Sequence, residues 1–328
     1  MKKVYVSLGL IVFFIIGFFA AEKLTKENTP TIRSKFLLGT IVEIQIRDSD
    51  SAKADAVISH AFNEIQRIDK LLSIYDSESP VCKINNSGDS IINVDEEVFG
   101  LMQRCDSFWR LSSDAFDISI GSVISTWGFD KGNPAIPSHK EITKALEHSG
   151  WEKVGFPDKN KIKKRNGMKF NFGAVAAGYA ADKAIEVIAR SGITDALVNT
   201  GGELRGIGDD WTIGIQHPRI SGQLLEKLQL HGKAVATSGD YELYFEKNGR
   251  RYHHIINPKD GFPAPECQSV TVIAENSLTA DALATGIFVL GPAKGLELTE
   301  SLENVEAYIV DSNGQILQSS GFKNFISR

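Results

Sequence analysis

The sequence contains little cysteine and no excess of basic residues. Its three cysteines, Cys82, Cys105 and Cys267, are widely spaced, with no CxxC pair and no Cys/His cluster. This pattern disfavours a zinc site. Cys105 has a helical spacing to Leu101 and Trp109, which predicts a small buried core residue. The formal net charge is -5, so the basic excess typical of nucleic-acid-binding proteins is absent.

Several catalytic and nucleotide-binding motifs are also missing. The sequence has no P-loop, no HExxH and no GxSxG. Gly206-Ile207-Gly208 lacks the third glycine of a Rossmann turn, because Trp211 occupies that position. A short basic run at residues 161–165 lies beside Asn166-Gly167, and we expect it to be a solvated turn, not a phosphate-binding patch.

The composition that remains is that of a globular protein. Hydrophobic residues make up 42% and charged residues 23% of the 328 residues, which excludes a wholly disordered or fibrous protein. This length allows one large domain or two modest domains with a sizeable core.

The N-terminus has the pattern of an export signal. Lys2 and Lys3 precede an apolar run at residues 4–21, and Glu22-Lys23 ends it. The run reaches the roughly 18 residues needed to cross a bilayer, so a cleaved signal peptide and an uncleaved membrane anchor both stay open. No cysteine follows it, which disfavours lipid attachment there. We expect a leader at 1–22, a linker at 23–31 and a folded domain at 32–328.

Periodicity predicts a mixture of helices and sequentially adjacent strands. Helices are expected at 54–72, at 95–111, after a Ser138/Glu141 capping box, at 178–190 and from about 279 to Gly291-Pro292. Strands are expected at 36–46, 196–199, 211–216, 225–236, 270–274 and 307–310, with a hairpin at 242–256 around Asn248-Gly249. Strands that follow one another through tight turns favour an α+β fold with largely antiparallel sheets over a doubly wound fold.

One segment suggests a cation site. Asp281 and Thr285 lie four residues apart near the start of a predicted helix capped by Thr279 or Ser277, so they share one helical face. An acid and a hydroxyl suit Mg²⁺ that is also held by phosphates, because Mg²⁺ takes few carboxylates. The alternative is an acid that simply complements the helix dipole.

Two further segments could contribute to a ligand site. Small residues at 171–182 run directly into a helix start, where backbone can approach a phosphate closely; tight helix–sheet packing is the alternative. Ser238-Gly239-Asp240-Tyr241 precedes the hairpin that ends in His253 and His254. Adjacent strand residues face opposite sides, so one histidine can act as a base in a site. An exposed or capped histidine at a strand end is the alternative.

Taken together and in order, these segments resemble the ApbE family, the FAD:protein FMN transferases. The resemblance extends from about Phe36 to about Pro292. The matching pieces are Leu38-Gly39-Thr40, Leu72-Ser73-Ile74-Tyr75, Ala115-Phe116-Asp117-Ile118-Ser119-Ile120-Gly121, Trp127-Gly128-Phe129, residues 171–182, Asn199-Thr200-Gly201-Gly202, Ser238-Gly239-Asp240-Tyr241, His254-Ile255-Ile256-Asn257-Pro258 and residues 280–285.

The resemblance implies a T-fold-like α+β architecture with FAD between two lobes. It implies Mg²⁺ on the FAD pyrophosphate, held by the side chains of Asp281 and Thr285 and the backbone carbonyl of Ala174, with His254 as the catalytic histidine. It places the flavin and adenine contacts on Leu38, Tyr75, Ala115, Phe116, Asp117, Asn171, Ala177 and Ile256.

The implied reaction attaches the FMN half of FAD to a threonine hydroxyl of a target flavoprotein and releases AMP. Implied targets are exported proteins such as subunits of ion-pumping NADH:quinone oxidoreductases. With the leader, this implies a protein at the periplasmic face of the inner membrane, anchored or released. Two alternatives stay open, namely an FAD pyrophosphatase that gives FMN and AMP, and a non-catalytic flavin-binding protein.

The sequence departs from the family pattern at several of these positions. Leu38 stands where methionine is usual, and Ala177 stands where a lysine or another polar residue is common. Ala284 stands where some members of the family carry a second acid. Asn171 and Asn257 stand where aspartate is frequent. The expected metal site therefore depends on a single carboxylate, that of Asp281.

Overall fold

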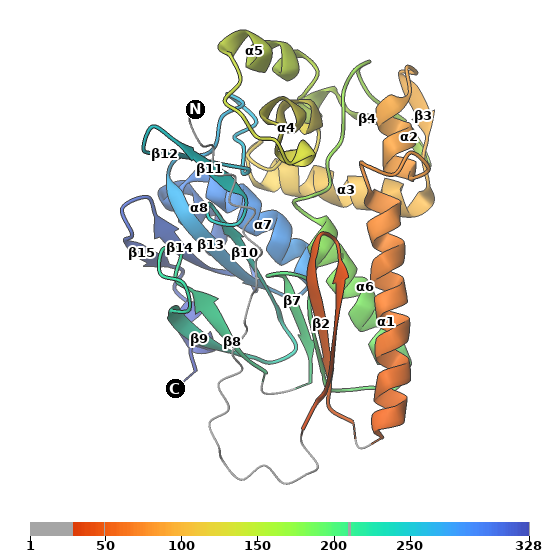
Figure 1. Cartoon of the computed structure of the whole chain (residues 1–328), viewed down its shortest axis with the longest axis vertical. Coiled ribbons are helices and arrows are strands. Elements are labelled where there is room, and N and C mark those ends of the chain that lie inside the picture. Colours follow the sequence, from red (N-terminus) through yellow and green to blue (C-terminus); the bar gives the residue numbers. More distant parts are fainter. Residues whose placement is uncertain (1–28, 49, 209–210, 328) are drawn as a thin grey trace, which may run out of the picture.

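A computed structural model of the chain describes residues 29–48, 50–208 and 211–327 (Figure 1). The expected leader at 1–22 and most of the expected linker at 23–31 lie outside these residues. Within the described part, no helix is both long enough and apolar enough to span a bilayer.

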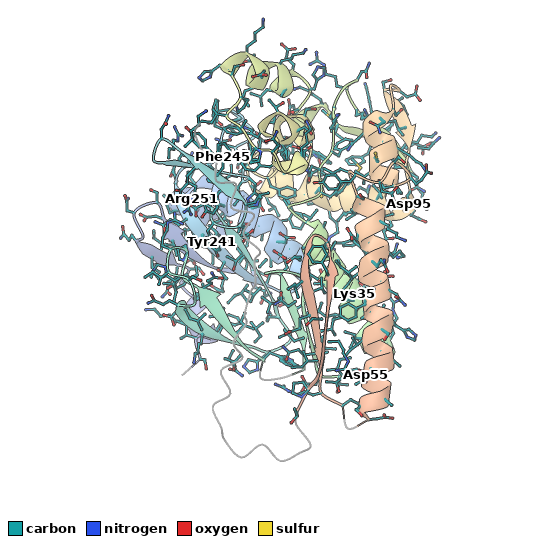
Figure 2. All side chains as sticks on the ribbon, in the orientation of Figure 1. Lys35, Asp55, Asp95, Tyr241, Phe245 and Arg251 are labelled. Carbon is teal, nitrogen blue, oxygen red and sulfur yellow. The ribbon has the colours of Figure 1, made fainter. Side chains whose placement is uncertain are left out.

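An antiparallel sheet of eight strands is the centre of the molecule. Its spatial order is β1-β2-β6-β7-β10-β13-β14-β15, and every neighbouring pair is antiparallel. The strands are β1 (Thr31–Leu37), β2 (Thr40–Ile46), β6 (Ala196–Asn199), β7 (Leu204–Ile207), β10 (Ala234–Gly239), β13 (Cys267–Ala274), β14 (Glu306–Asp311) and β15 (Ile316–Gln318). The predicted α+β class is confirmed. β1 forms one edge, where exposed Lys35 (Figure 2) is the kind of charge that protects an open strand edge.

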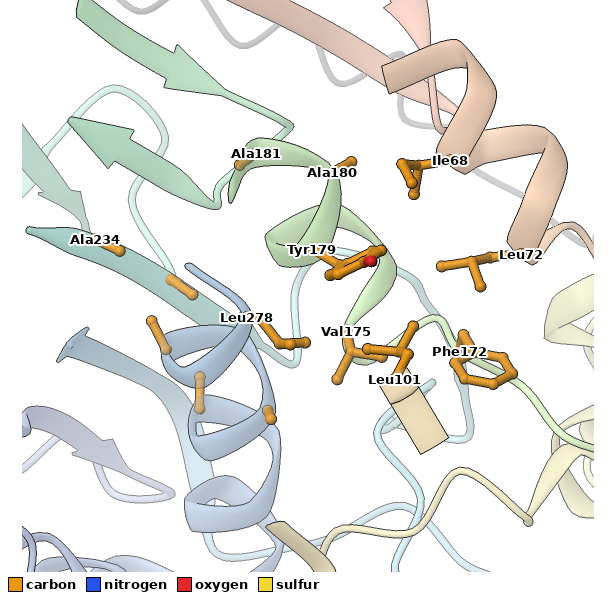
Figure 3. Packing of buried hydrophobic residues seen from close by; sticks show 14 of the residues in the cluster. Ile68, Leu72, Leu101, Phe172, Val175, Tyr179, Ala180, Ala181, Ala234 and Leu278 are labelled. Carbon is orange, nitrogen blue, oxygen red and sulfur yellow. The ribbon is translucent and has the colours of Figure 1, made fainter. Parts of the chain in front are cut away.

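Four helices cover one face of this sheet: α1 (Ser51–Leu72), α6 (Ala176–Arg190), α7 (Ser277–Leu290) and α8 (Pro292–Glu300). The predicted apolar stripe of α1 is buried, and the helix begins where the Asp50 side chain accepts from two backbone N–H groups. Figure 3 shows Ile68 of α1, Tyr179 of α6 and Leu278 of α7 within one cluster. α6 therefore lies between α1 and α7, and it positions the start of α7.

The other face of the sheet is covered by a two-stranded ribbon. β8 (Trp211–Gln216) and β9 (Leu224–Leu230) pack their apolar side chains onto Val235 of β10 and Ile273 of β13. The neighbouring strand residues Ala234 and Val272 point to the helices instead. Because side chains alternate along a strand, β13 has apolar partners on both faces, and all eight of its residues are buried.

A third apolar cluster surrounds Trp127, the last residue of α4 (Gly121–Trp127), a helix labelled near the upper end of the molecule in Figure 1. It joins the hairpin of β11 (Tyr244–Lys247) and β12 (Arg250–His253) to two helices, α4 and α5 (His139–Glu147). The remaining elements are α2 (Pro80–Asn86), α3 (Glu96–Leu111), β3 (Ile91–Asn93), β4 (Gly155–Asp158), β5 (Lys161–Lys163), η1 (Phe129–Lys131), η2 (Trp151–Lys153) and η3 (Phe322–Phe325).

Several sequence expectations about these elements were wrong. Residues 36–46 form no single strand, because the chain reverses at Leu38 and Gly39, whose φ angles are 55° and 76°. Residues 225–236 are likewise divided between β9 and β10 by a turn that contains Gly232 at φ 62°. A non-glycine residue such as Leu38 is uncommon in the left-handed region. The local sequence therefore did not predict the turn between β1 and β2.

Two smaller expectations also need correction. The cap of α7 is Asn276, whose side chain accepts from the Thr279 N–H, and not Thr279 or Ser277. The basic run at 161–165 is no solvated turn, because Lys164 is only 2% exposed and its Nζ donates to the carbonyls of Ser87 and Met168. Burial lowers the pKa of Lys164.

Candidate active site

Helices α6 and α7 meet at a glycine. The backbone N–H of Gly178, in the first turn of α6, donates to Asp281 Oδ2 at 3.0 Å. A Cβ at Gly178 would lie 2.5 Å from the Ser277 carbonyl oxygen and 2.8 Å from the Asp281 Cβ. Because only glycine permits this approach, the small-residue segment at 171–182 and the segment that carries Asp281 form a single site.

This contact leaves the carbonyl of Ala174 without its usual donor. In a regular helix the Gly178 N–H would donate to the Ala174 carbonyl four residues earlier, but it donates to Asp281 instead. No other donor within residues 29–48, 50–208 and 211–327 reaches this oxygen. The Ala174 carbonyl oxygen is thus unused at the start of α6, the turn whose Gly178 N–H bonds to the Asp281 carboxylate.

The end of β10 brings a second hydroxyl to this group. Thr285, one helical turn after Asp281, has its Oγ1 3.2 Å from the Ser238 Oγ. Asp281 itself is only 6% exposed. Thr285 on α7 therefore meets Ser238 of β10, and Asp281, one turn earlier on α7, meets the start of α6 through Gly178. Each of these parts of the chain offers oxygen atoms.

A glycine turn between β6 and β7 lies next to the start of α6. The N–H groups of Gly201 and Gly202 donate to Asn199 Oδ1 at 3.0 and 3.1 Å, and Thr200 Oγ1 donates to the Ala177 carbonyl at 3.0 Å. Gly201 has φ 107° and lies against Thr40. The turn thus links the sheet to the start of α6, and Glu203 follows it.

Three carboxylates interact here, and two of them were not predicted from the sequence. Burial raises the pKa of Asp281 to about 7, although the bond from Gly178 opposes this. Burial and the charge of Asp281 raise the pKa of Glu242 to about 8. Burial, Asp281 and Glu242 also raise the pKa of Glu203. Each negative charge disfavours the others, so a bound cation would relieve all three.

These acids do not form an all-carboxylate metal cage. Across the described residues, no group of three His, Cys, Asp or Glu side chains is arranged to hold a metal ion. An ion beside Asp281 would instead take a mixed set of carboxylate, hydroxyl and carbonyl oxygens. The signals for Glu203 and Glu242 were their positions directly after Thr200-Gly201-Gly202 and Ser238-Gly239-Asp240-Tyr241.

His254 has the hydrogen bonds of a neutral base. Its Nδ1 lies 3.2 Å from the Leu243 carbonyl; because a carbonyl can only accept, Nδ1 carries the proton and Nε2 keeps its lone pair. Burial lowers the pKa of His254, so the ring is neutral at neutral pH. Leu243 directly follows Glu242, which connects this histidine to the acidic group.

His253 has different surroundings, as the alternation along the strand predicted. Its Nε2 lies 3.0 Å from the Ala264 carbonyl, and its Nδ1 accepts from the Ile255 N–H at 3.3 Å. Burial lowers its pKa to about 4. Both ring nitrogens are therefore in use, and His254 is the better candidate for proton transfer.

The residues expected to contact flavin or adenine fall into three groups, of which the first two differ in their exposure. Leu38 at the β1–β2 turn is partly buried, and Tyr75 is 74% exposed. Ala115, Phe116 and Ile256 are buried in the core, which leaves mainly their backbone atoms for a ligand. The contacts of these residues with FAD stay predictions.

Asp117 and Asn171 already bond to neighbouring backbone. Asp117 accepts from the N–H groups of Ser119 at 2.6 Å and Trp151 at 3.1 Å, and burial raises its pKa. Asn171 Oδ1 accepts from the Gly173 N–H at 2.8 Å. The carbonyl of Ala177 is occupied by Thr200. These groups hold the loops around the site in their present arrangement.

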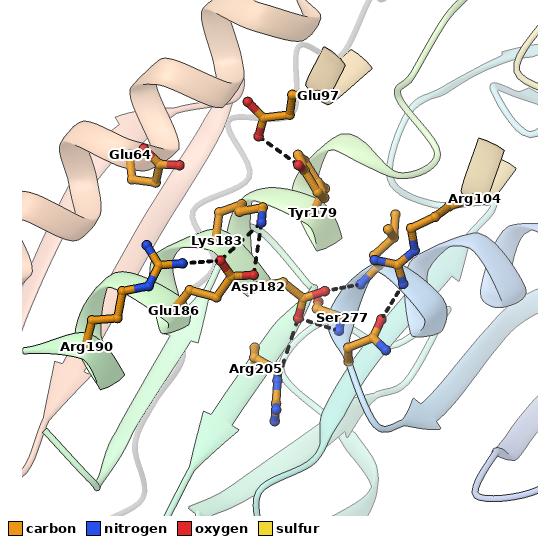
Figure 4. A network of polar contacts seen from close by, with 12 residues as sticks. Glu64, Glu97, Arg104, Tyr179, Asp182, Lys183, Glu186, Arg190, Arg205 and Ser277 are labelled. Atoms are coloured by element: carbon orange, nitrogen blue, oxygen red, sulfur yellow. Dashed lines mark hydrogen bonds and ion pairs between the residues drawn. The ribbon is translucent and has the colours of Figure 1, made fainter. Parts of the chain in front are cut away.

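A second aspartate fixes the start of α7. Asp182 of α6 accepts from the N–H groups of Ser277 and Leu278 at 2.8 and 2.9 Å, and Arg205 Nε lies 3.6 Å from its carboxylate. Figure 4 shows this network, with Arg104 bonded to the α7 cap residue Asn276. Asp182 thereby sets the position of the turn that carries Asp281.

Comparisons with known proteins identify the family of this chain. The family model described as the ApbE family matches residues 38–309. An "FAD:protein FMN transferase" of Klebsiella pneumoniae is 32% identical over 292 residues, which cover 88% of this chain and 91% of that protein. A homologue of the same name from Treponema pallidum is 29% identical over 316 residues, covering 88% of this chain and 86% of that one.

Solved structures show the same fold. The crystal structure of the ApbE protein from Thermotoga maritima superposes with a TM-score of 0.86 at 35% identity and covers 92% of this chain and 100% of that one. The apo flavinyl transferase ApbE of Pseudomonas stutzeri has a TM-score of 0.82 at 29% identity, with 92% and 98% covered. The resemblance found in the sequence is thus confirmed, and the chain belongs to the ApbE family, whose curated relatives are transferases.

Proposed function

We propose that this chain transfers the FMN half of FAD to a threonine hydroxyl of a target flavoprotein, with Mg²⁺ as the required ion. The names of the relatives support flavin transfer. The observation that carries the proposal is the group of oxygens at the α6–α7 contact, namely the unused Ala174 carbonyl, the Asp281 carboxylate and the Thr285 hydroxyl.

The residues present fit a magnesium ion. Mg²⁺ prefers oxygen ligands and is usually bound through one or two carboxylates together with substrate phosphates. Asp281, Thr285 and the carbonyl of Ala174 would hold it, and Glu203 and Glu242 add negative charge nearby. When bound, the ion supplies charge neutralisation for the FAD pyrophosphate.

His254 would remove the proton from the incoming hydroxyl. In the transfer, the threonine oxygen forms a bond to the FMN phosphorus, the bond from that phosphorus to the bridging oxygen breaks, and AMP leaves with this oxygen. The hydroxyl proton goes to Nε2 of His254, which has a free lone pair because Nδ1 donates to Leu243. Positioning and charge neutralisation supply most of the remaining catalysis in phosphoryl transfer.

The proposed place of action is the periplasmic face of the inner membrane. The apolar run at 4–21 after Lys2 and Lys3 supports export. The proposed acceptors are exported flavoproteins, such as a subunit of an ion-pumping NADH:quinone oxidoreductase.

One experiment tests the function. The protein is mixed with FAD, Mg²⁺ and such a subunit, and mass spectrometry is used to look for an added FMN on a threonine. AMP release without modified acceptor would replace the transferase proposal with FAD pyrophosphatase activity. FAD binding with neither product would favour a flavin-binding protein.

Replacing the base tests its role separately. We expect His254→Ala to bind FAD as the wild type does but to lose at least about a hundredfold in transfer rate, because general-base catalysis contributes on this scale. His60→Ala, at an exposed position on α1, is the control. Unchanged transfer by His254→Ala would remove this residue as the base.

A further inference from the structure

A segment centred on Phe170 pairs with a neighbouring stretch of backbone along one of its sides. The N–H of Asn171 donates to the Ile118 carbonyl at 2.8 Å, and the Lys169 carbonyl accepts from the Gly121 N–H at 3.0 Å. In such a pairing the backbone groups of successive residues point to opposite sides. The N–H and carbonyl of Phe170 therefore point away from this pairing. They need another partner, because Phe170 is only 1% exposed.

A single side chain makes both of these bonds. Asn85 Oδ1 accepts from the Phe170 N–H at 2.7 Å, and Asn85 Nδ2 donates to the Phe170 carbonyl at 2.8 Å. The amide thus binds the backbone of Phe170 as a neighbouring strand would. Because the N–H must meet an oxygen and the carbonyl must meet an N–H, these two bonds also fix which way the amide faces.

Helix α2 holds Asn85 in a fixed position. Val81 and Ile84 of this helix are buried in the main core cluster. Beyond its last turn, the Nζ of buried Lys164 donates to the carbonyl of Ser87. The burial of Lys164, which the sequence did not predict, therefore fixes the C-terminal end of α2. The Asn85 amide thus lies on a support that is held both by the core and at the helix end.

The segment that Asn85 holds leads directly to groups expected to bind FAD and Mg²⁺. Phe170 and Phe172 are buried, whereas Asn171 between them is partly exposed. Figure 3 shows Phe172 within the core cluster. Asn171 is an expected FAD contact, and the Ala174 carbonyl two residues after Phe172 is an expected ligand of the ion. Asn171 is therefore held between two fixed points, namely the Asn85 bonds and the buried Phe172 ring.

We propose that Asn85 is a positioning residue of the transferase, whose amide holds the backbone at Phe170 so that Asn171 and the Ala174 carbonyl are placed for FAD and Mg²⁺. The inference rests on the proposed function and adds a residue that acts through the backbone, since both polar groups of its amide are bonded to Phe170. Its loss should weaken FAD binding more than it slows the chemical step, because the proposed metal-binding acid and the proposed base lie on other elements.

The test compares the loss of two neighbouring amides. Asn85→Ala removes the bonds to Phe170, whereas Asn86→Ala removes an exposed amide whose Nδ2 donates to Cys82 Sγ at 3.3 Å. Ile84→Val shortens a buried side chain of the same helix and is the control for lost stability.

Three quantities are measured for each variant of the full chain. FAD affinity comes from an equilibrium titration in the presence of Mg²⁺. Initial rates of FMN attachment to a subunit of an ion-pumping NADH:quinone oxidoreductase, taken against FAD concentration, give KM and kcat. The melting temperature reports stability, so that a loss of binding can be distinguished from a loss of folded protein.

We expect Asn85→Ala to raise both the dissociation constant and the KM for FAD about tenfold, while kcat at saturating FAD and Mg²⁺ falls less than about threefold. Ile84→Val should lower the melting temperature, and Asn86→Ala should not; both should keep the KM for FAD within about twofold of the wild type. Equal FAD affinities in Asn85→Ala and Ile84→Val would overturn the inference, and so would a loss in Asn85→Ala that is confined to kcat.

A second variant separates the two bonds from the packing of the side chain. Asn85→Asp keeps the size and shape of the side chain and can still accept from the Phe170 N–H, but its carboxylate has no donor for the Phe170 carbonyl. We expect it to raise the KM for FAD at least about fivefold, and it serves as the test if Asn85→Ala does not fold. A wild-type KM for FAD in Asn85→Asp would show that the bond to the Phe170 carbonyl is not needed and would overturn the inference.

The two proposals fail in different ways. If the wild-type enzyme binds FAD but attaches no FMN, the transferase function is wrong, and the FAD affinities of the variants still test the role of Asn85. If the wild type attaches FMN and Asn85→Ala binds FAD as tightly as the wild type, only the role of Asn85 is wrong.

Discussion

Asp182 and Asp281 lie at the two ends of the α6–α7 contact, and each accepts a backbone hydrogen bond from the first turn of the other helix. Asp182 accepts two, from Ser277 and Leu278, and has Arg205 beside it. Asp281 accepts one, from Gly178. Both sites thus hold an aspartate that accepts from backbone N–H groups. They differ in how many N–H donors and positive charges lie around the carboxylate.

The difference separates a structural acid from a reactive one. Burial raises the pKa of Asp182, but two N–H donors and the charge of Arg205 oppose this rise, whereas only one N–H donor does so at Asp281. Asp281 has a single donor, and the negative charges of Asp182, Glu203 and Glu242 lie near it. A buried acid with incomplete compensation is a candidate for binding a cation, and its neighbour supplies the fixed position that such a site needs.

The largest expected effect comes from the same substitution, aspartate to asparagine, made at each of the two acids in turn. Asp281→Asn should lower the rate of AMP release from FAD about a thousandfold, because an uncompensated charge develops in the transition state. Asp182→Asn should stay within about tenfold of the wild type, since the amide oxygen still accepts from one of the two backbone N–H groups, and Asp182 does not contact the substrate in the proposed reaction. Steady-state AMP assays with matched, folded samples decide this. Equal losses in both variants would end the distinction.

A change at the helix contact should disturb both acids together. Gly178→Ala places a Cβ 2.5 Å from the Ser277 carbonyl oxygen, so the helices must move apart, at a cost of about 1–3 kcal/mol, and activity should fall with stability. Gly100→Ala on α3 is the control, because nothing lies within 4 Å of its added Cβ; there alanine should stabilise the helix by about 0.5–1 kcal/mol. Urea unfolding measures both, and a stable, active Gly178→Ala would contradict the contact.

Removal of the Asp182 side chain should lower the free energy of unfolding more than removal of an exposed helix cap. Asp182→Ala leaves two N–H groups of α7 unsatisfied in a partly buried place, so the free energy of unfolding should fall by about 2–4 kcal/mol. Asp50→Ala removes the exposed α1 cap, which also accepts from two N–H groups, and should cost about 1 kcal/mol. Urea unfolding again distinguishes them, and equal losses would show that burial of the cap does not matter.

The last expected effect is a pH dependence of stability in the absence of Mg²⁺ and FAD. The folded pKa of Glu242 is about 8, so between pH 6.5 and 8 the native state holds a proton that the unfolded state has lost. The free energy of unfolding should therefore fall by about 2 kcal/mol as pH rises through this range.

Glu242→Gln should remove this part of the decline, whereas Glu303→Gln at an exposed site should keep it. Below pH 6.5, the lowered pKa values of His253 and His254 give the opposite slope, so the range above 6.5 isolates the acids. Melting temperatures in EDTA measure the effect, and parallel curves for the two variants would contradict the raised pKa of Glu242.

Elements with strong local signals could be predicted from the sequence. The apolar stripe of α1 and the capping box of α5 were found where expected. Asn248-Gly249 has φ angles of 53° and 75° in the β11–β12 hairpin, because these residues tolerate positive φ at low cost. In each case neighbouring residues alone settle the conformation.

The β1–β2 turn and the burial of Lys164 could not be predicted in this way. Leu38 adopts a left-handed conformation that its own propensity disfavours, and Lys164 is buried because carbonyls of Ser87 and Met168 surround its Nζ. Each depends on residues far along the chain or on the pairing of whole strands.

The sequence by itself determined the longer helices α1, α3, α6 and α7, many of the strands, the α+β class and the motifs that carry the family resemblance, including Asp281, Thr285 and His254. It did not reveal α2, α4 or α8. Local hydrogen bonding and side-chain periodicity act over a few residues, so the sequence displays them directly. Only the tertiary structure decided that Glu203 and Glu242 join Asp281, that Ala174 keeps a free carbonyl, and that three arginines line a cavity together with His253. These depend on the packing of α6 against α7 and of the hairpin against β10, which brings together residues that are distant in sequence.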